Sequence, residues 1–374
     1  MANMKNLDYV DTMRGIAILL VILVHTAQKV TGLTNWVSYA AKYGQMGVQL
    51  FFVASAYTLC LTFTRRQGEP KPLVSFFIRR FFRIAPLYYF AIVLYFAVHV
   101  LLIQWRPSSG DLTGDPYTIV TVFSNLLFIH GFVPSANNTI VPGGWSIGTE
   151  MALYVCFPML FAFFTRLNAI QPRLLWVVTI ACLVLNVAFQ SMVAFFSEQF
   201  IGNNHFLYFN LVNQLPVFLL GMTAFFLHHN GSRSSIISFV PLQAAGVILC
   251  TACAMVLWQL GGSLSFAFLP TISGLSFIFL LNLLRSINNH CGALRSIGKS
   301  SYSMYVFHFI FASYLVPAVI KALNPQLLPE LILFASFVLV TGLTYVVAVF
   351  TQQVIEGRGI AFGKTVVARL QGKF

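Results

Sequence analysis

The sequence predicts an all-α, polytopic membrane protein, and three observations lead to this fold class. The 374 residues are 58% hydrophobic and 8% charged, with a mean hydropathy of +0.81, whereas soluble domains contain about 25% charged residues. About ten apolar segments are long enough to cross a bilayer as helices. The basic residues gather in alternate connections, which is typical of membrane proteins. The ten predicted spans occupy residues 15–34, 46–64, 84–103, 147–165, 174–192, 207–227, 236–258, 264–284, 302–320 and 331–354.

The distribution of Lys and Arg predicts which side of the membrane each connection faces. With the N-terminus in the cytoplasm, ten spans return the C-terminus to the same side, and 18 of the 22 Lys and Arg residues are cytoplasmic. Because cytoplasmic loops carry an excess of Lys and Arg, this orientation is favoured over its inverse. The same pattern accounts for the net charge of +13, so we expect no nucleic-acid partner. The four bases predicted on the outer side are Lys29, Lys42, Arg106 and Lys321.

Two apolar segments are predicted to contact the membrane without crossing it. Residues 117–130 are too short for a span, so we expect an outer re-entrant or interfacial segment. Residues 75–86, SFFIRRFFRIAP, place Arg79, Arg80 and Arg83 within one arc of about 100°. This pattern predicts a cytoplasmic interfacial helix that its proline ends. The basic face either anchors the protein to anionic lipid, or Arg80 and Arg83 clamp a phosphorylated ligand.

The stretch DTMRGIAILLVILVH, residues 11–25, carries two ionisable side chains that point the same way. Arg14 and His25 are eleven residues apart, which is three helical turns plus about 20°. The helical rise separates them by about 16 Å. We therefore expect Arg14 at the cytoplasmic boundary and His25 past the middle of the hydrocarbon core. Because burying an ionisable group in a membrane costs free energy, His25 is a functional candidate. Alternatively, it only forms a hydrogen bond with a neighbouring helix.

The segment GGWSIGTEMALYVCFP, residues 143–158, starts a span with an acid. Glu150 is predicted to enter the membrane from the outer side, with Trp145 at the outer interface. Its carboxylate could fix the tautomer of His25 and stabilise the imidazolium, as carboxylates do in triads. The alternative is a favourable interaction of Glu150 with the dipole at the helix N-terminus.

The segment IGKSSYSMYVFHF, residues 297–309, is the last polar candidate. Ser301, Tyr305 and His308 share one helical face, and Lys299 precedes them on the cytoplasmic side. Together they could bind an anionic ligand. Alternatively, Tyr305 and His308 only bond each other across the bundle.

Several reactive residue types receive no chemical role from the sequence. Five of the six cysteines lie within apolar segments, so we expect no disulfides. Cys250 and Cys253 form a C-x-x-C inside a span, which we interpret as packing, and we expect no metal. We expect one integral-membrane domain over residues 1–374, with residues 355–374 as a short basic cytoplasmic tail at the membrane surface. The histidines without a role are His99, His130, His205, His228, His229 and His290.

Taken together, the quoted segments resemble the acyltransferase 3 family of integral-membrane acyltransferases. The resemblance rests on the Arg14-x10-His25 pair after LDYVDTMRGIA, the run GVQLFFVASAY, the Arg80-x-x-Arg83 helix ending in RIAP, the segment WSIGTEMALYVCFP and the span SYSMYVFHF. It covers essentially the whole chain, and the order of the motifs is more specific than any one of them. One departure is VASAY, where many members have a Ser-Gly pair. The family typically has ten spans with cytoplasmic termini, in agreement with the spans drawn above.

The resemblance implies an enzyme of the bacterial inner membrane. Members move an acyl group, often acetyl, from cytoplasmic acyl-coenzyme A to a hydroxyl, usually of a surface or exported glycan. It implies that Arg14, Arg80 and Arg83 bind the donor acetyl-coenzyme A, that His25 acts as general base, and that Glu150 orients it. Lys299, Tyr305 and His308 are further donor-binding candidates, and Trp145 and Ser146 are candidates for contact with the acceptor. The alternative function is a transporter or flippase of an anionic lipid-linked saccharide, with His25 as a proton relay.

The predicted topology also suggests that the two substrates approach from opposite sides. The cationic candidates are cytoplasmic, whereas Glu150 and Trp145 reach His25 from outside. The pantetheine arm of the donor would then thread the bundle, and the acceptor would enter beneath residues 117–144. The rival interpretation is a wholly cytoplasmic reaction in which His25 is structural.

Overall fold

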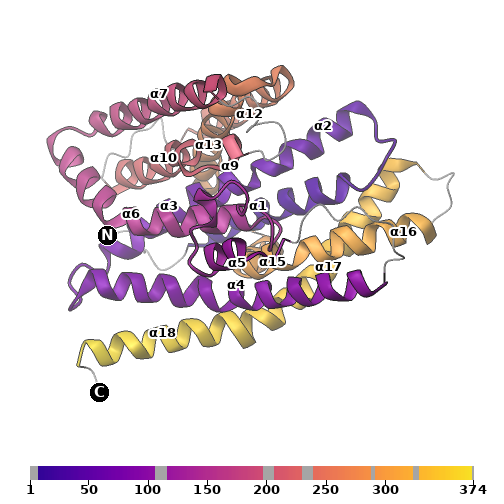
Figure 1. The fold of residues 1–374 in the computed structure, drawn as a ribbon. Coiled ribbons are helices and arrows are strands. Elements are labelled where there is room, and N and C mark those ends of the chain that lie inside the picture. Colours follow the sequence, from indigo (N-terminus) through magenta and orange to yellow (C-terminus); the bar gives the residue numbers. More distant parts are fainter. Residues whose placement is uncertain are drawn as a thin grey trace.

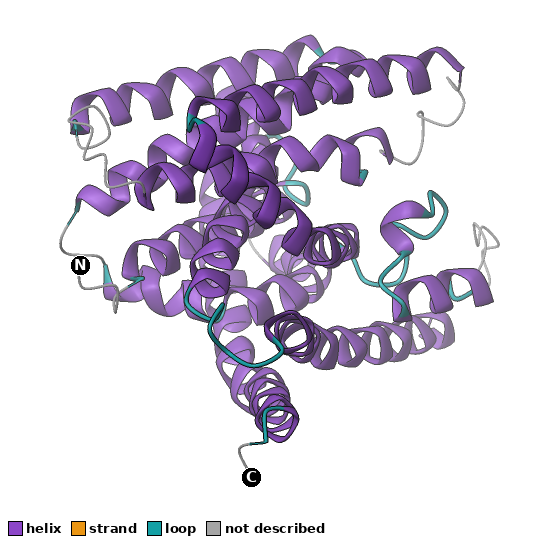
Figure 2. Ribbon diagram, turned by 90° about the vertical axis from the view of Figure 1, so that its left-hand side faces the viewer, coloured by secondary structure: helices purple, strands orange, loops and turns teal. Residues whose placement is uncertain are grey.

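The computed structural model describes residues 7–105, 116–196, 206–229, 239–287, 291–322 and 328–372, and every regular element in these ranges is helical (Figure 2). Ten helical runs within them are long and apolar enough to cross a membrane, which confirms the predicted fold class. Arg106, His205 and His290 lie outside the described residues. The elements are α1 (Asp8–Ala27), α2 (Asn35–Tyr43), η1 (Gly44–Met46), α3 (Gly47–Thr64), α4 (Pro72–Trp105), α5 (Ile119–Leu126), η2 (His130–Phe132), α6 (Gly144–Ile170), α7 (Arg173–Phe196), α9 (Phe206–Phe209), α10 (Leu211–His229), α12 (Val240–Leu260), α13 (Gly262–Ser286), α14 (Gly292–Lys299), α15 (Ser301–Ile310), the π-helical η3 (Phe311–Leu315), α16 (Val316–Ala322), α17 (Pro329–Thr351), the π-helical η4 (Gln352–Glu356) and α18 (Gly357–Leu370).

Helix α1 lies at the centre of the bundle, where it contacts α3, α13, α14, α15 and α17. In Figure 1, α7 and α12 run along one edge of the bundle, and α4 and α18 run along the opposite edge. Met13, Ile18 and Ile22 of α1 are fully buried, whereas Leu185 of α7 and Leu249 of α12 are exposed. Apolar side chains face outward on these outer helices because lipid, not water, surrounds a membrane-spanning bundle.

The first span begins and ends seven residues earlier than predicted. Helix α1 starts at Asp8 instead of residue 15 and ends at Ala27 instead of residue 34. Two acids, Asp8 and Asp11, occupy its first turn, where negative charge interacts favourably with the helix dipole. His25 therefore lies in the last turn of α1, nearer the outer end of the helix than the predicted position past the middle of the membrane core.

The predicted interfacial helix at residues 75–86 is instead the first part of α4, which continues without a break through Pro86 to Trp105. A proline inside a helix leaves the carbonyl four residues earlier without its intrahelical donor, here the carbonyl of Phe82. Gly359 of α18 packs directly against this oxygen, and the hydroxyl of Tyr302 donates to the carbonyl of Ile84 at 2.8 Å. Neighbouring helices thus cover the backbone groups around the proline, as is usual in membrane helices.

The basic tail predicted at the membrane surface continues the last helix. Helices α17 and α18, joined by η4, form one apolar run from Pro329 to Leu370, and α18 packs along α4 (Figure 1). The segment predicted to be re-entrant contains only the short helix α5 and the turn η2, and it is not among the ten spanning runs. Helix α5 turns Thr121, Ser124 and Asn125 inward and exposes its apolar side chains.

Candidate active site

A polar cavity of about 650 Å³ lies between α1, α3, α4, α6 and α15. It brings together candidates that are far apart in the sequence, because α3 and α15 pack on α1, while α4 packs on α6 and α15 and α6 packs on α3. Arg14, Arg80, Arg83, Glu150, Ser146 and Tyr305 are all on its wall, as is Ser55 of α3. We call it the central cavity. Its remaining wall is formed by Val48, Phe51, Phe52, Ile84, Ile147, Tyr154, Ser301 and Tyr302.

Two of the three arginines in the central cavity are held by threonine hydroxyls of α3. The Arg14 guanidinium donates to Oγ1 of Thr58 at 3.1 Å, and its other Nη lies 3.8 Å from the Asp11 carboxylate. The Arg80 guanidinium donates to Oγ1 of Thr62 at 3.0 Å. It also lies 5.7 Å from the ring centroid of Tyr154, within the range of a cation–π interaction. These contacts fix the direction of both side chains and leave part of each guanidinium fork facing the cavity.

Arg83 has no hydrogen bond or ion pair to any part of the chain that the structure describes. The carboxylates of Glu356, Glu150 and Asp11 act on its charge through space. A guanidinium presents five N–H donors in a planar fork. Arg83 is therefore free to take a doubly charged oxygen ligand such as a phosphate.

A second cavity of about 760 Å³ adjoins the first and shares Arg80 and Arg83 with it. Arg66, Arg79 and Lys364 bring its positively charged residues to five, and no acid in the described part of the chain lines it. We call it the basic cavity. Thr62, Phe63, Pro72, Phe76 and Ile360 complete its wall. Because the two cavities share two arginines, one elongated anionic ligand could occupy both.

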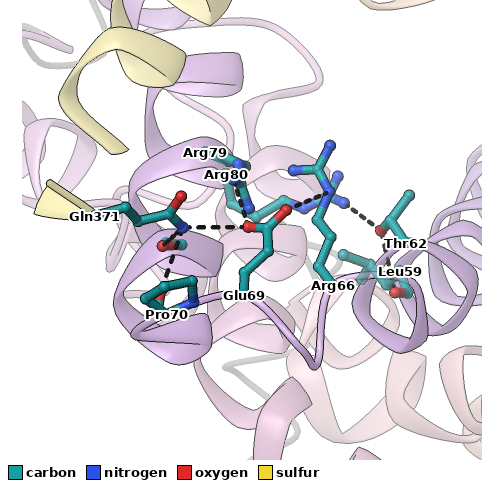
Figure 3. A network of polar contacts seen from close by, with 9 residues as sticks. Leu59, Thr62, Arg66, Glu69, Pro70, Arg79, Arg80 and Gln371 are labelled. Carbon is teal, nitrogen blue, oxygen red and sulfur yellow. Dashed lines mark hydrogen bonds and ion pairs between the residues drawn. The ribbon is translucent and has the colours of Figure 1, made fainter. Parts of the chain in front are cut away.

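A network of polar contacts holds the rim of the basic cavity (Figure 3). The Glu69 carboxylate accepts from Arg79 at 2.7 Å, and it also lies 4.0 Å from Arg66. The amide nitrogen of Gln371, just beyond α18, donates to Glu69, to the carbonyl of Pro70 and to Ser75. Partial burial acts to raise the pKa of Glu69, but the hydrogen bond and charge of Arg79 outweigh it and lower the pKa below its ordinary value. This network ties the end of α18 to the start of α4.

Glu150 does not contact His25, contrary to the expected orienting role. Its carboxylate accepts from the Ser55 hydroxyl at 2.6 Å and from the Tyr154 hydroxyl. Both donors are on the wall of the central cavity. The reason is geometric: Glu150 lies in the second turn of α6 and faces α3, whereas His25 lies at the far end of α1 beside α15.

The end of the central cavity toward α6 carries two hydroxyls bound to one carbonyl. The Ser146 hydroxyl donates to the hydroxyl of Tyr305 at 2.8 Å and lies 3.0 Å from the carbonyl of Gly143. The Tyr305 hydroxyl donates to the same carbonyl at 3.0 Å. Gly143 has a positive φ of 76°, which aims this carbonyl at both hydroxyls and which only glycine adopts without strain.

His25 and His308 lie beyond Tyr305, and neither forms part of the cavity wall. Their ring centroids are 5.4 Å apart, and the His308 ring is 5.6 Å from that of Tyr305. Nδ1 of His25 lies 3.0 Å from the amide oxygen of Gln28, and Nδ1 of His308 lies 2.8 Å from the carbonyl of Tyr305. An oxygen of either kind only accepts, so both Nδ1 atoms donate and both Nε2 atoms are left as acceptors. Nε2 of His308 is buried without a partner among the described residues.

Two other predicted site residues lie elsewhere. Trp145, expected at the outer interface, is 5% exposed and stacks on Phe209 at a centroid distance of 4.5 Å. Large aromatic rings bury more apolar surface in a packed interior than at an interface, and the rings of Phe52 and Tyr208 also contact Trp145 edge-on. Lys299 is exposed and lines neither cavity.

The structure adds site residues that sequence reasoning did not single out: Gln28, Lys364, Glu356 and His130. His130 is buried, and its Nε2–H donates to the carbonyl of Gly144 at 2.8 Å, next to the Gly143 turn. The Tyr88 hydroxyl, 3.2 Å from the same nitrogen, connects it to Asn125 of α5. Burial lowers the pKa of His130, although its backbone hydrogen bonds act in the opposite direction. The one sequence signal for His130 was its place at the end of the short re-entrant segment.

In the described residues, ten helical runs are long and apolar enough to cross a membrane, and an arginine-lined cavity lies between five of the helices, which defines a polytopic membrane protein with an internal polar site. A family model described as an acyltransferase domain matches residues 7–351. The chain therefore belongs to the acyltransferase 3 family and is a multi-pass membrane acyltransferase, which favours the enzyme over the transporter. Neither the curated proteins nor the solved structures compared with the chain gave a match. In the described part of the chain, no group of three or more His, Cys, Asp and Glu residues is arranged to hold a metal ion.

Proposed function

We propose that the protein transfers an acyl group, acetyl in the simplest case, from cytoplasmic acyl-coenzyme A to a hydroxyl of a surface or exported glycan across the bacterial inner membrane. The observation that carries this proposal is the pair of adjoining cavities that share Arg80 and Arg83. Coenzyme A combines several phosphates at one end with a long, thin arm that ends in the thioester. The basic cavity, which adjoins the polar central cavity through Arg80 and Arg83, fits this shape and charge.

In this proposal, His25 is the general base. Its Nδ1–H donates to Gln28, so its Nε2 is the atom able to accept a proton. The acceptor hydroxyl gives its proton to Nε2 while its oxygen attacks the thioester carbonyl carbon. The carbon–sulfur bond then breaks, and the coenzyme A thiolate takes the proton back from the imidazolium. A positioned base of this kind contributes about 10²–10⁴-fold to the rate.

The hydroxyls of Ser146 and Tyr305 suit a second role in the same reaction. Attack on the thioester creates a negatively charged oxygen, and preorganised donors stabilise such an oxyanion. The Tyr305 hydroxyl donates to the Gly143 carbonyl, and the Ser146 hydroxyl, which donates to Tyr305, lies within reach of the same carbonyl, so one hydroxyl can turn to the substrate while the other bonds the carbonyl. Tyr305 also stands between the central cavity and the two histidines, so the thioester must pass it to reach His25.

The sidedness of the reaction follows from the charge distribution and from the position of His25. The basic cavity is at the end that we propose to be cytoplasmic, and His25 lies in the last turn of α1 at the opposite end. The acyl group alone would then cross the membrane, with the acceptor arriving near α5 and the loop before α6.

The test uses inside-out membrane vesicles that enclose envelope glycan, supplied on the outside with radiolabelled acetyl-coenzyme A. The wild type should place label in the enclosed glycan, His25→Ala should not, and His99→Ala, a histidine near the end of α4 away from the cavities, should behave as the wild type. A thermal shift shows that His25→Ala still binds the donor: saturation at a hundredfold excess over Kd stabilises by about 2.7 kcal/mol. Normal transfer by His25→Ala would exclude it as the base, and label confined to glycan outside the vesicles would exclude transfer across the membrane.

A further inference from the structure

We propose that the C-terminal helix α18, which lies outside the family match at residues 7–351, supplies a specificity residue of the donor site: Lys364 recognises the 3′-phosphate of the phosphorylated adenosine end of coenzyme A. This inference rests on the proposed function and adds to it. Two arginines, Arg80 and Arg83, reach both cavities and are placed for the diphosphate. Lys364 lines only the basic cavity, on the side formed by α18.

The position of Lys364 follows from how α18 packs on α4. Gly359 and Gly363 lie one helical turn apart and face α4, where a Cβ on Gly359 would come within 2.7 Å of the Phe82 carbonyl oxygen. A Cβ on Gly363 would come within 2.8 Å of the Phe82 Cβ. Small residues at this spacing allow membrane helices to approach closely. Ile360 and Lys364, each one position further along, are thereby turned to the cavity wall.

The composition of the basic cavity matches a phosphorylated purine nucleoside. Its wall combines five cationic side chains with apolar and aromatic surface from Phe63, Pro72, Phe76 and Ile360. A flat purine ring can lie on such surface while phosphates meet the cations. Three cations line the basic cavity and not the central cavity, and two of them, Arg66 and Arg79, already form ion pairs with Glu69. Lys364 has no acid within 4.0 Å among the described residues.

The same chemistry could also bind the phosphate of an anionic lipid. A lipid headgroup carries one phosphate and no purine, whereas the basic cavity offers several cations around an apolar wall. The observations therefore favour the nucleotide. The experiment includes an arm that separates the two sources.

The experiment measures binding to the full-length protein in nanodiscs of neutral lipid. The probes are acetyl-coenzyme A and its 3′-dephospho form. The wild type should prefer acetyl-coenzyme A. Lys364→Gln should reduce this preference by about tenfold, the order expected when one charge-assisted contact is lost, by weakening only the binding of acetyl-coenzyme A. Arg358→Gln, which removes the same charge from an exposed position on α18 outside the cavity wall, should keep the full preference.

A second pair of variants tests the helix rather than the charge. Gly359→Leu should push α18 from α4 and remove the preference for the 3′-phosphate, whereas Gly342→Leu, at a glycine with no atom within 4 Å of its Cβ position, should not. The proposal is overturned if Lys364→Gln weakens both donors equally or changes neither. It is also overturned if phosphatidylglycerol in the nanodisc abolishes the preference for acetyl-coenzyme A over its 3′-dephospho form. The phosphate of an anionic lipid would then be the ligand of Lys364. If the wild type binds neither donor, the proposed function fails and this inference fails with it.

Discussion

At the level of single residues, the tautomer of His25 depends on one amide. Gln28 accepts the Nδ1–H of His25 at 3.0 Å, and this bond leaves Nε2 free to take a proton. Gln28→Leu removes the acceptor and allows the other tautomer. We expect kcat to fall by about tenfold or more, a smaller loss than the 10²–10⁴-fold of removing the base, with an unchanged KM for acetyl-coenzyme A. Steady-state kinetics check this, with the exposed loop residue Gln67 changed to Leu as control, and a purely KM effect would contradict it.

The contacts of Glu150 with Ser55 and Tyr154 predict another result for its substitution than a role in orienting His25 would. Its carboxylate accepts from Ser55 and Tyr154, and Glu150 is the one acid that the described ranges contribute to the central cavity wall. Glu150→Gln keeps an accepting oxygen and removes a negative charge, so acetyl-coenzyme A should bind as tightly or more tightly. Glu150→Leu leaves two buried hydroxyls without their acceptor and should destabilise the protein by about 1–3 kcal/mol. Calorimetric titration and thermal unfolding measure these effects. Weaker donor binding by Glu150→Gln would contradict this assignment.

Some features of the central cavity could be predicted from the sequence, and others could not. Helical spacing placed Arg80 and Arg83 on one side of their helix, and both line the central cavity, because spacing on one helix determines direction. The same spacing paired Arg14 with His25, but of these two only Arg14 lines this cavity. Contacts between helices cannot be derived in this way. The partner of Glu150 depends on the rotation of α6 against α3, and the partner of His25 depends on where α1 ends.

At the level of elements, the segment with α5 and η2 is held in place by a glycine. A Cβ on Gly148 of α6 would lie 2.7 Å from Nε2 of His130, where His130 also bonds the Gly144 carbonyl. Gly148→Ala should therefore displace η2 and the Gly143 turn. We expect a loss of about 1–3 kcal/mol in the free energy of unfolding, as for other overpacked sites, and faster hydrogen exchange over residues 117–132. Gly342→Ala, which meets open space, is the matched control, and equal exchange in both variants would contradict the prediction.

The contact between α18 and α4 should depend on pH through Glu69. The pKa of Glu69 in the folded protein is depressed below its ordinary value of 4.5. The stabilisation that the ionised Glu69 carboxylate gives to the folded protein is therefore complete above pH 4.5. It is lost as the pH falls through the lower pKa that Glu69 has in the folded protein. The protection of the amides of residues 357–370, relative to their intrinsic exchange rate at each pH, should fall over this acidic range in the wild type. In Glu69→Gln this protection should already be low at neutral pH and should not change with acidification, and a wild-type profile in that variant would exclude Glu69 as the cause.

Elements were predictable where composition alone decides them. Ten spans follow from the length of the apolar segments, and all ten are found. Helix α18 was not predictable, because Gly357, Gly359 and Gly363 each disfavour a helix by about 0.5–1 kcal/mol and suggested a tail. Packing against α4 reverses this preference, since the same glycines allow close contact. Pro86 is the converse case, because a proline on its own predicts the end of a helix. Helix α4 continues through it because α18 and Tyr302 cover the backbone around it.

At the level of the whole molecule, the orientation in the membrane can be tested through one thiol. Cys291 is exposed at the start of α14 in a connection predicted to be cytoplasmic, and hydrogen bonds from the backbone N–H groups of Leu294 and Ala293 lower its pKa. A lowered pKa favours the reactive thiolate. A membrane-impermeant maleimide should therefore label inside-out vesicles and leave right-side-out vesicles unlabelled, with the labelling lost in Cys291→Ser. The opposite pattern would invert the topology and place the basic cavity outside.

The crowding of positive charge around Arg83 has a consequence for the handling of the protein. Among the residues that the structure describes, the walls of the two cavities carry six cationic side chains and one carboxylate, that of Glu150. Like charges repel strongly where little water screens them, so the protein without its donor is under internal repulsion. Any small multivalent anion relieves part of it. Sulfate or phosphate in a purification buffer would occupy the cationic site and compete with the binding of the donor. Chloride at the same ionic strength would leave the site free to bind the donor.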